Sequence, residues 1–446
     1  MSTVAPYRPR RLDDVVLAGR PEQVGRVSSV IGLGVEVEGL RAAIGDVLVV
    51  GGPSNLRVEV VAVTPTRLRA MPLDSTAGLT VGVEVRTTHG GMRVPTGRAL
   101  LGRVIDAAGR PIDGRGPLVD DEYSSVDNVS PEPLDRARID QPLALGVRAM
   151  DTLLTIGRGQ RMGLFAGSGV GKSSLMSMIA RGSDAAVSVI ALVGERGREV
   201  REFLEDDLGA EGLARSVVVV ATADSPALLR LRAAFTATRI AEAFRDRGDD
   251  VVLMMDSLTR VAMAQREIGL SVGEPPATRG YPPSTFAVLA RLLERAGNGA
   301  HGSITGLYTV LVDGDDHNEP IADAARSILD GHVVLDRSLA VSGHYPAIDV
   351  LASISRSYSK IVSRDDADAA VALRRVLAAR QQARDLIDVG AYQRGANPLV
   401  DAALDHENTI QAFLTQRMDA PVPFDDSWGQ LRALAALLGT PGGGVA

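Results

Sequence analysis

A glycine-rich segment between an apolar strand and an apolar helix constrains the fold of this chain more than any other feature. The pattern predicts a strand over Arg161–Ala166 and a helix over Gly171–Arg181, joined by a turn that contains Gly-Ser-Gly-Val-Gly. Glycines in such a turn let backbone N–H groups converge on phosphate oxygens, and the helix N-terminus adds the positive end of its dipole. The arrangement is that of a Walker A loop, with Ala166 in place of the first glycine.

The loop supplies a full set of candidate phosphate ligands. Lys172 is placed to bridge the β- and γ-phosphates of a nucleotide, and the hydroxyl of Ser173 to ligate Mg²⁺. The chain has only two lysines, Lys172 and Lys360, among its 48 basic residues, so a lysine retained at this position favours a chemical role. The alternative is a glycine-rich turn without a ligand. The predicted cofactor-binding residues of the loop are Gly167, Ser168, Gly169, Val170, Gly171, Lys172, Ser173 and Ser174.

Two carboxylates follow apolar strands downstream of the loop. Asp256 ends the run Val251–Met255, as in a Walker B motif, where the carboxylate holds the water shell of Mg²⁺. Glu195 follows the strand Val187–Val193, and hydrolysis needs a base or a water-positioning group. The adjacent Arg196 is a candidate contact to the same phosphate. On the residues alone, Asp256 as a helix cap and Glu195 as an exposed loop charge remain open.

Three segments of the chain differ in pattern. Residues 1–90 carry short valine-rich strands with glycine-containing breaks, typical of a small β-barrel or sandwich. The strands expected there are Val24–Val37, Asp46–Val50, Arg57–Val63, Arg67–Met71 and Thr80–Thr87. Within residues 91–364, apolar strands alternate with helices from about residue 160, which predicts a parallel sheet covered on both faces. The strands expected there are Arg161–Ala166, Val187–Val193, Ser216–Ala221, Val251–Met255 and Ile304–Val312. Residues 365–446 show only helical spacing, with helices expected over Ala369–Val389, Pro398–Leu414 and Trp428–Leu438. The predicted fold class is therefore α/β, with a P-loop, RecA-like nucleotide-binding core between an N-terminal β-barrel domain and a C-terminal helical domain.

The composition excludes several classes of protein. The 446 residues hold no cysteine, which excludes disulfides, thiolate metal sites and a cysteine nucleophile. No apolar run approaches the roughly 20 residues that span a bilayer. The N-terminus has basic residues but no apolar stretch of the secretory type, so we expect a cytoplasmic protein. The net charge of −7 argues weakly against a nucleic-acid partner.

Several longer stretches match one group of enzymes. They are GQRMGLFAGSGVGKSSLM (159–176), VGERGREVREF (193–203), MDSLTRVAMAQREIGL (255–270), GEPPATRGYPPSTFAVLARLLERAGNG (273–299), DGDDHNEPIADAARSILDGHVVLDRSLA (313–340), HYPAIDVLASISR (344–356) and VGAYQRGANPLVDAA (389–403). Through them the chain resembles the flagellar type III protein export ATPases, which are relatives of the injectisome secretion ATPases and of the catalytic subunits of rotary ATP synthases.

This resemblance implies roles that the motifs alone do not assign. Glu195 would be the catalytic carboxylate that polarises the attacking water. Arg356, which ends the block SISR, would reach into the neighbouring subunit's site as an arginine finger. Tyr345 would stack on the adenine in its own subunit, with Phe424 as a candidate to complete the adenine wall. Arg260 is a candidate partner of Glu195 or of the γ-phosphate.

The resemblance also implies an assembly and a cellular place. A six-stranded N-terminal barrel is expected, and a ring-shaped homohexamer that uses ATP and Mg²⁺ to energise or load flagellar type III export. The implied partners are a stator-like export regulator, a central coiled-coil stalk protein, export substrate–chaperone complexes and the export gate at the membrane, with no nucleic acid. The protein would be cytoplasmic and peripheral to the inner face of the cell membrane.

Four alternatives stay open at this point. An injectisome ATPase differs from a flagellar one in the machine that it serves. A rotary synthase subunit would carry an acidic helix in the tail, where residues 365–389 mix Asp with Arg. An RNA translocase would need aromatic residues on its β module, whereas residues 24–90 contain no Trp, Tyr or Phe. A non-catalytic scaffold would lose the carboxylate that Glu195 supplies.

Overall fold

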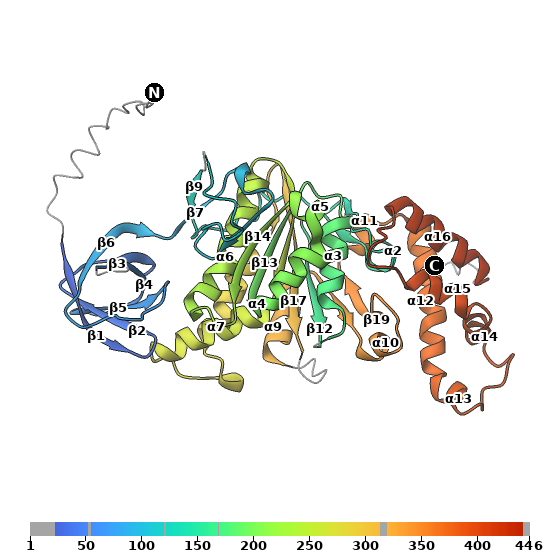
Figure 1. The fold of residues 1–446 in the computed structure, drawn as a ribbon. Helices are drawn as coiled ribbons and strands as arrows, with labels where there is room; N and C mark the ends of the chain where they lie inside the picture. The colour runs from blue at the N-terminus through green and yellow to red at the C-terminus, as the bar shows by residue number, and fades with distance from the viewer. Residues whose placement is uncertain (1–22, 52–54, 120–121, 168, 313–318, 440–446) are drawn as a thin grey trace, which may run out of the picture. The chain divides into compact units, whose positions relative to one another are not determined.

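The computed structural model describes residues 23–51, 55–119, 122–167, 169–312 and 319–439 (Figure 1). The chain forms two compact units, Met1–Met92 and Arg93–Ala446. The predicted loop residue Ser168 lies outside the described residues.

Six antiparallel strands close into a barrel in the first unit. They are β1 (Gly25–Ile31), β2 (Gly34–Glu38), β3 (Asp46–Val50), β4 (Leu56–Val63), β5 (Arg67–Pro72) and β6 (Glu84–Gly91), in the order β1-β2-β5-β4-β3-β6, with β6 pairing with β1. Inward-facing apolar side chains such as Val37 and Val58 are fully buried and fill the interior. The predicted strand Val24–Val37 is a pair of strands, because Gly32 turns the chain with a φ of 57°.

One large sheet organises the second unit. Its strands are β8 (Arg103–Asp106), β12 (Arg161–Ala166), β13 (Val187–Glu195), β14 (Ser216–Thr222), β15 (Asp250–Asp256), β17 (Ser303–Leu311), β18 (Gly331–Leu335) and β19 (Ile348–Ser355), with β16 (Gly297–Asn298) beside β17. The order is β19-β18-β12-β17-β15-β13-β14-β8, and only β19 runs antiparallel to its neighbour on this path. All five predicted strands are present; β8, β18 and β19 were not predicted.

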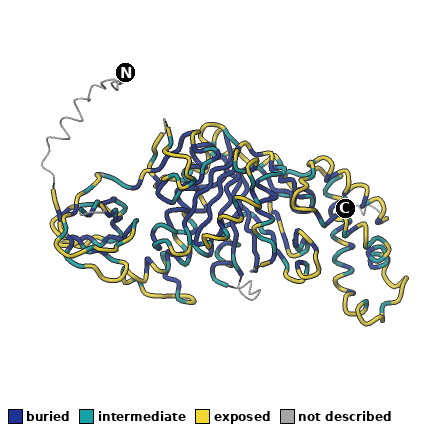
Figure 2. Tube along the Cα trace, viewed as in Figure 1, coloured by how far each residue is buried: buried dark blue, intermediate teal, exposed yellow. Residues whose placement is uncertain are grey.

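Helices cover both faces of this sheet, as the alternation of strands and helices predicts. One face is covered by α3 (Lys172–Gly182), α4 (Gly197–Glu202), the π-helical turn η2 (Phe203–Leu208) and α5 (Gly209–Ala214). The other face is covered by α6 (Ala227–Asp246), α7 (Leu258–Ser271) and α9 (Pro320–Ile328), with α8 (Pro283–Glu294) against α7 and α9. Figure 2 shows the strands as the buried interior between these layers. Burial on both faces explains why the strands are continuously apolar.

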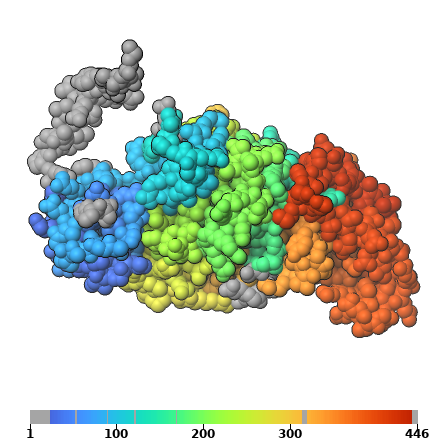
Figure 3. Space-filling model, in the orientation of Figure 1, coloured from blue at the N-terminus to red at the C-terminus, as the bar shows by residue number. Residues whose placement is uncertain are grey.

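The tail is helical and shares the core of the sheet. It contains α12 (Arg364–Gln382), α13 (Arg384–Asp388), α14 (Pro398–Asp405), α15 (Glu407–Leu414) and α16 (Phe424–Leu437). Trp428 and Leu431 of the tail join Leu175 of α3 in one hydrophobic cluster. In the space-filling view the tail, orange-red to red, adjoins the orange segment near β19 (Figure 3). Each of the first two helices predicted for the tail is divided into two shorter ones.

Short elements complete the second unit. They are β7 (Arg93–Pro95), η1 (Arg98–Leu100), β9 (Tyr123–Ser125), β10 (Pro142–Leu143), α2 (Arg148–Leu153), β11 (Ile156–Gly157), η3 (Thr278–Gly280), α10 (Arg337–Val341) and α11 (Tyr358–Ile361). Within the described ranges, no helix combines the length and the apolar character that crossing a membrane requires.

Candidate active site

The loop between β12 and α3 has the backbone of an anion-binding turn. Gly169 (φ 77°) and Gly171 (φ 91°) adopt left-handed conformations that favour glycine. Val170 between them is buried and packs into the hydrophobic cluster beneath the loop. Gly171 is the N-cap residue of α3 and has no side chain to occupy the first N–H groups of the helix. The turn therefore presents backbone donors on a fixed base, which suits a phosphate group.

The other loop residues flank this turn. Gly167 is buried at the end of β12, whereas Ser173 is exposed and Ser174 half-buried in the first turn of α3. A hydroxyl in the first turn of the helix lies where the loop and the strand ends converge. Ser173 lies in this turn, and its role as a metal ligand stays a prediction.

Three charged side chains meet at the carboxyl edge of the sheet. Asp256 ends β15 and Glu195 ends β13, and these strands are neighbours in which Leu192 pairs with Asp256. Lys172 Nζ lies 2.5 Å from Asp256 Oδ1 and 3.7 Å from Glu195 Oε1. The structure thus brings the three residues predicted from the two Walker motifs and from strand β13 into one cluster.

A threonine on the next strand holds Asp256 in place. The hydroxyl of Thr309, on β17, donates a hydrogen bond of 2.8 Å to Asp256 Oδ1. Asp256 is only 4% exposed, so its carboxylate depends on such partners. The motifs do not point to Thr309. Its position near the end of a strand that pairs with β15 is the only signal in the sequence.

The setting of Glu195 changes its proton affinity. Burial and the nearby charge of Asp256 raise the pKa of Glu195 to about 7, while Lys172 opposes the shift. A carboxylate whose pKa lies near neutrality is matched to accept a proton at physiological pH. The geometry and the pKa both fit the role of a general base.

The oxygen donors at the loop fit Mg²⁺. They are the Ser173 hydroxyl and the Asp256 carboxylate, and Mg²⁺ prefers such ligands and usually binds one or two of them together with phosphates and waters. Among the described residues, no group of three or more His, Cys, Asp and Glu side chains forms a metal site by itself. This donor set therefore suits a metal ion that is shared with the phosphates of a nucleotide.

An aromatic side chain stands beside the phosphate loop. Tyr345 belongs to the loop between α10 and β19, and a Cβ atom placed on Gly171 would lie 3.4 Å from Tyr345 Cε1. The tyrosine is 42% exposed, so part of its ring faces solvent. Phe424 is half-buried and packs edge-to-face against Trp428, with the ring centroids 6.3 Å apart. An aromatic surface is thus available next to the loop for a flat group.

Two predicted arginines are not brought into the cluster. Arg196 is highly exposed and donates to Glu199 Oε1 at 3.2 Å. Arg356 follows β19 and donates to the Arg326 carbonyl at 3.2 Å, also at an exposed position. Arg260, by contrast, lies against the backbone just before Glu195, because a Cβ on Gly194 would meet its aliphatic carbons at 3.0–3.2 Å.

Known proteins match nearly the whole chain. The model of the ATP synthase alpha/beta family, nucleotide-binding domain, matches residues 146–355, and that of the T3SS EscN ATPase C-terminal domain matches residues 362–433. The flagellum-specific ATP synthase of Bacillus subtilis (strain 168) is 51% identical, over 95% of this chain and 98% of its own length. The chain belongs to the type III export ATPase family.

Two further relatives of this type III export ATPase come from secretion systems. The type 3 secretion system ATPase of Xanthomonas euvesicatoria is 50% identical, over 89% of this chain and 90% of its own. The assembled ATPase EscN, solved with its central stalk EscO from the enteropathogenic E. coli type III secretion system, has a TM-score of 0.87 and 42% identity. It covers 92% of this chain, and all of the EscN chain is matched.

Family membership decides the activity of this type III export ATPase. It takes a nucleotide substrate, hydrolyses ATP and serves type III protein export. The EscN-type model on residues 362–433 favours an export ATPase over a rotary synthase subunit for the tail. The fold also agrees with the resemblance, since the six-stranded barrel, the nucleotide-binding core and the C-terminal helices are all present.

Proposed function

We propose that this export ATPase hydrolyses ATP at the cluster of Lys172, Glu195 and Asp256. The observation that carries the proposal is the placement of one ammonium and two carboxylates at the mouth of the phosphate loop. Lys172 binds the β- and γ-phosphates, and the backbone N–H groups of the loop bind the phosphate oxygens around it. Tyr345 stacks on the adenine beside Gly171.

The hydrolytic step uses Glu195 as the base. Water attacks the γ-phosphorus while Glu195 accepts its proton, and the bond from the γ-phosphorus to the β–γ bridging oxygen breaks. ADP and inorganic phosphate are released. The raised pKa of Glu195 supports this role, because the carboxylate gains enough basicity to take the proton near pH 7.

Ser173 and Asp256 are the residues that would hold Mg²⁺ in this site. When bound, Mg²⁺ neutralises phosphate charge and orients the β- and γ-oxygens. Thr309 keeps the Asp256 carboxylate aimed at the loop through its hydrogen bond. We expect Lys172 to exchange its contact with Asp256 for the phosphates when the nucleotide binds, because phosphates in the loop would compete for the same ammonium.

We further propose a hexameric ring in which Arg356 completes the site of a neighbouring subunit. Its exposed position and its contact with the Arg326 carbonyl, rather than with the Lys172 cluster, support a role outside its own site. The assembled state of the relative EscN supports the ring, and its complex with EscO supports a central stalk as a partner. Arg196 remains a candidate for a phosphate contact once Glu199 releases it.

A mixing experiment tests the shared site. Lys172→Ala and Arg356→Ala are each expected to abolish turnover. Subunits of both kinds in one ring form some intact interfaces, so the mixture should regain part of the wild-type activity. A mixture as inactive as its components would overturn the role of Arg356 in trans. Size-exclusion chromatography of the mixture confirms that rings form.

We propose the flagellar export apparatus as the machine served, with the injectisome as the second candidate because a secretion ATPase is nearly as similar, with 50% identity over 89% of this chain against 51% over 95%. The proposed domains are the N-terminal barrel (residues 1–90), the nucleotide-binding core (residues 91–364) and the C-terminal helical domain (residues 365–446). The proposed partners are the stator-like regulator, the export substrate–chaperone complexes and the membrane gate, at the cytoplasmic face of the membrane. Complementation of a non-motile strain lacking its flagellar export ATPase tests this choice. Rescue of secretion but not of motility would favour the injectisome.

A further inference from the structure

The loop that carries Tyr345 is held from two sides. On its own side, the His344 backbone N–H donates to the Leu339 carbonyl at 3.0 Å, which anchors the loop to α10. From the tail, Gln411 Oε1 lies 2.8 Å from His344 Nδ1, and the Gln416 N–H donates to the Tyr345 carbonyl at 2.8 Å. Two consecutive loop residues are therefore tied to the tail by separate hydrogen bonds.

Gln416 forms hydrogen bonds with three segments of the chain: the start of α2, the loop that carries Tyr345, and the turn after α15. Its side-chain amide donates to the carbonyls of Gly146 (2.7 Å) and Ala420 (2.9 Å) and accepts from the Arg148 N–H (2.9 Å). Gln416 is 9% exposed, and these bonds use both polar atoms of its side chain. Through its backbone bond to Tyr345, it joins the loop to the start of α2 and to the turn after α15.

The same turn also reaches the far end of the phosphate-loop helix. Arg181, in the last turn of α3, donates to the Met418 carbonyl at 2.7 Å. Backbone packing is close here, since a Cβ on Gly146 would lie 2.8 Å from Gly182 Cα. The turn after α15 thus contacts both the helix that begins at the phosphate loop and the loop that carries Tyr345.

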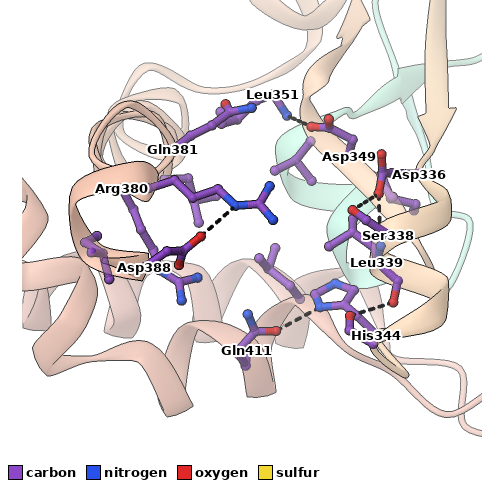
Figure 4. Close-up of a pocket in the computed structure, with 17 residues that line it drawn as sticks. Asp336, Ser338, Leu339, His344, Asp349, Leu351, Arg380, Gln381, Asp388 and Gln411 are labelled. Atoms are coloured by element: carbon purple, nitrogen blue, oxygen red, sulfur yellow. Dashed lines mark hydrogen bonds and ion pairs between the residues drawn. The ribbon is translucent and has the colours of Figure 1, made fainter. Parts of the chain in front are cut away.

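Polar bonds matter at this place because apolar packing is interrupted by a cavity. A cavity of about 520 Å³ lies between α10 and β19 on one side and α12, α13 and α15 on the other. Figure 4 shows His344 and Gln411 joined across one end of this cavity, with Gln381 on α12 away from that bond. The lining leaves space where close packing would otherwise fix the loop. Gln411 Oε1 is the hydrogen-bond partner of the His344 ring, whose residue is only 8% exposed.

We infer that Gln411 is a positioning residue of the nucleotide site. It holds His344, and through it the neighbouring Tyr345, so that the tyrosine ring stands beside the phosphate loop. The tail thereby sets the affinity for the base of the nucleotide without touching the nucleotide. This inference rests on the stacking role proposed for Tyr345.

Binding to the full-length protein, measured by calorimetry, separates the base from the phosphates. ADP carries both, whereas inorganic tripolyphosphate carries phosphates alone. Tyr345→Ala should weaken ADP binding by about 5–150-fold, the range for loss of an aromatic–base stack. Gln411→Met keeps the side-chain volume and removes the acceptor, and should weaken ADP binding by about three- to tenfold, a part of that range. Neither change should alter the Kd of tripolyphosphate.

Companion variants exclude a general loss of structure. Gln411→Glu keeps an acceptor for His344 and should bind ADP as the wild type does. Gln381→Met alters a glutamine that lines the same cavity but takes no part in the hydrogen bonds to His344 and Tyr345, and should leave ADP binding unchanged. Because Gln411 acts through Tyr345, the double variant Tyr345→Ala/Gln411→Met should bind ADP no more weakly than Tyr345→Ala alone.

The outcomes distinguish the positioning role of Gln411 from the stacking role proposed for Tyr345. If Tyr345→Ala leaves ADP binding unchanged, the stacking role fails and the inference with it. If Tyr345→Ala responds and Gln411→Met does not, only the inference is overturned. It is equally overturned if Gln411→Met weakens ADP and tripolyphosphate alike, or if the two effects add in the double variant.

Discussion

The two ends of the proposed nucleotide site are built in different ways. The phosphate side, made of Lys172, Glu195, Asp256 and Thr309, draws on the strands β13, β15 and β17 of one sheet and on the start of α3, the helix that follows β12. The base side, made of Tyr345 and its ties, draws on a loop and on the tail far along the chain. Strand pairing fixes Glu195, Asp256 and Thr309 of the first side, whereas the second side depends on where the tail lies.

This difference predicts that the two sides govern different properties of the site. Side chains at the ends of paired strands keep their geometry for as long as the sheet does. A loop held by a few hydrogen bonds across a cavity responds to small movements of the helices around it. We therefore expect changes on the phosphate side to affect the rate of hydrolysis and changes on the base side to affect affinity.

The largest effect on kcat is expected from Arg356, which lies on neither the phosphate side nor the base side of its own subunit's site. Arg356→Ala should lower kcat by about 10³–10⁵-fold, as for other arginine fingers, because charge on the transferring phosphoryl group loses its partner. The measurement is steady-state ATP turnover, with ADP binding as a second readout that should not change.

Arg375→Ala serves as the control for Arg356→Ala, since Arg375 is an exposed arginine on α12. It should retain full turnover. A drop of less than tenfold for Arg356→Ala would place the completing charge elsewhere, with Arg196 and Arg260 as the next residues to replace.

The next largest effect is expected on the phosphate side. Glu195→Gln removes the base but keeps the shape of the side chain, and should lower kcat by about 10²–10⁴-fold with the KM for ATP little changed. Steady-state kinetics measure both constants. Glu202→Gln, at an exposed position on α4, should be silent. Normal turnover by Glu195→Gln would rule out this carboxylate as the base.

A smaller loss of kcat/KM is expected when the hydrogen bond that Thr309 donates to Asp256 is removed. Thr309→Val removes the hydrogen bond to Asp256 without changing the shape of the side chain, and should lower kcat/KM by roughly tenfold or more, as for a bond to a charged group. Thr309→Ser restores the hydroxyl and should recover the rate. Equal loss in both variants would mean that packing of β17, and not the hydrogen bond, is responsible.

The smallest effect is a pH dependence. The pKa of Glu195 is raised to about 7, so the protonated form, which cannot accept a proton, dominates below that pH. The kcat/KM of the wild type should therefore rise about tenfold from pH 6 to pH 8 and then level off. The residual activity of Glu195→Gln should show no such rise. A flat wild-type profile over this range would contradict the role of Glu195 as the base.

The phosphate side could be predicted from the sequence because its signals are local. A glycine-rich loop after a strand, and carboxylates after two further strands, meet at one edge as soon as those strands lie in a parallel sheet. Lys172, Glu195 and Asp256 were named on that ground and lie together. The same logic missed Thr309, since a threonine near the end of a strand has no distinctive pattern around it.

The base side could not be derived from local patterns. Tyr345 was expected only from the resemblance to a family, and Gln411 and Gln416 were not expected at all. The contacts that join the loop to the tail link residues far apart in the chain, 67 positions for His344 and Gln411, and such pairings depend on how the tail packs. Arg196 shows the opposite case, where a carboxylate three residues along, Glu199, gives a local partner that the motif analysis overlooked.

The cluster at the phosphate loop also has a charge balance. One cation, Lys172, lies between two carboxylates, so these three groups together offer no excess positive charge to a polyanion. In the proposed ring, a bound metal ion and Arg356 of the neighbouring subunit would supply positive charge that these three groups do not. Each subunit of the proposed ring would therefore supply only part of the positive charge that ATP hydrolysis needs. Hydrolysis would then depend on assembly of the ring.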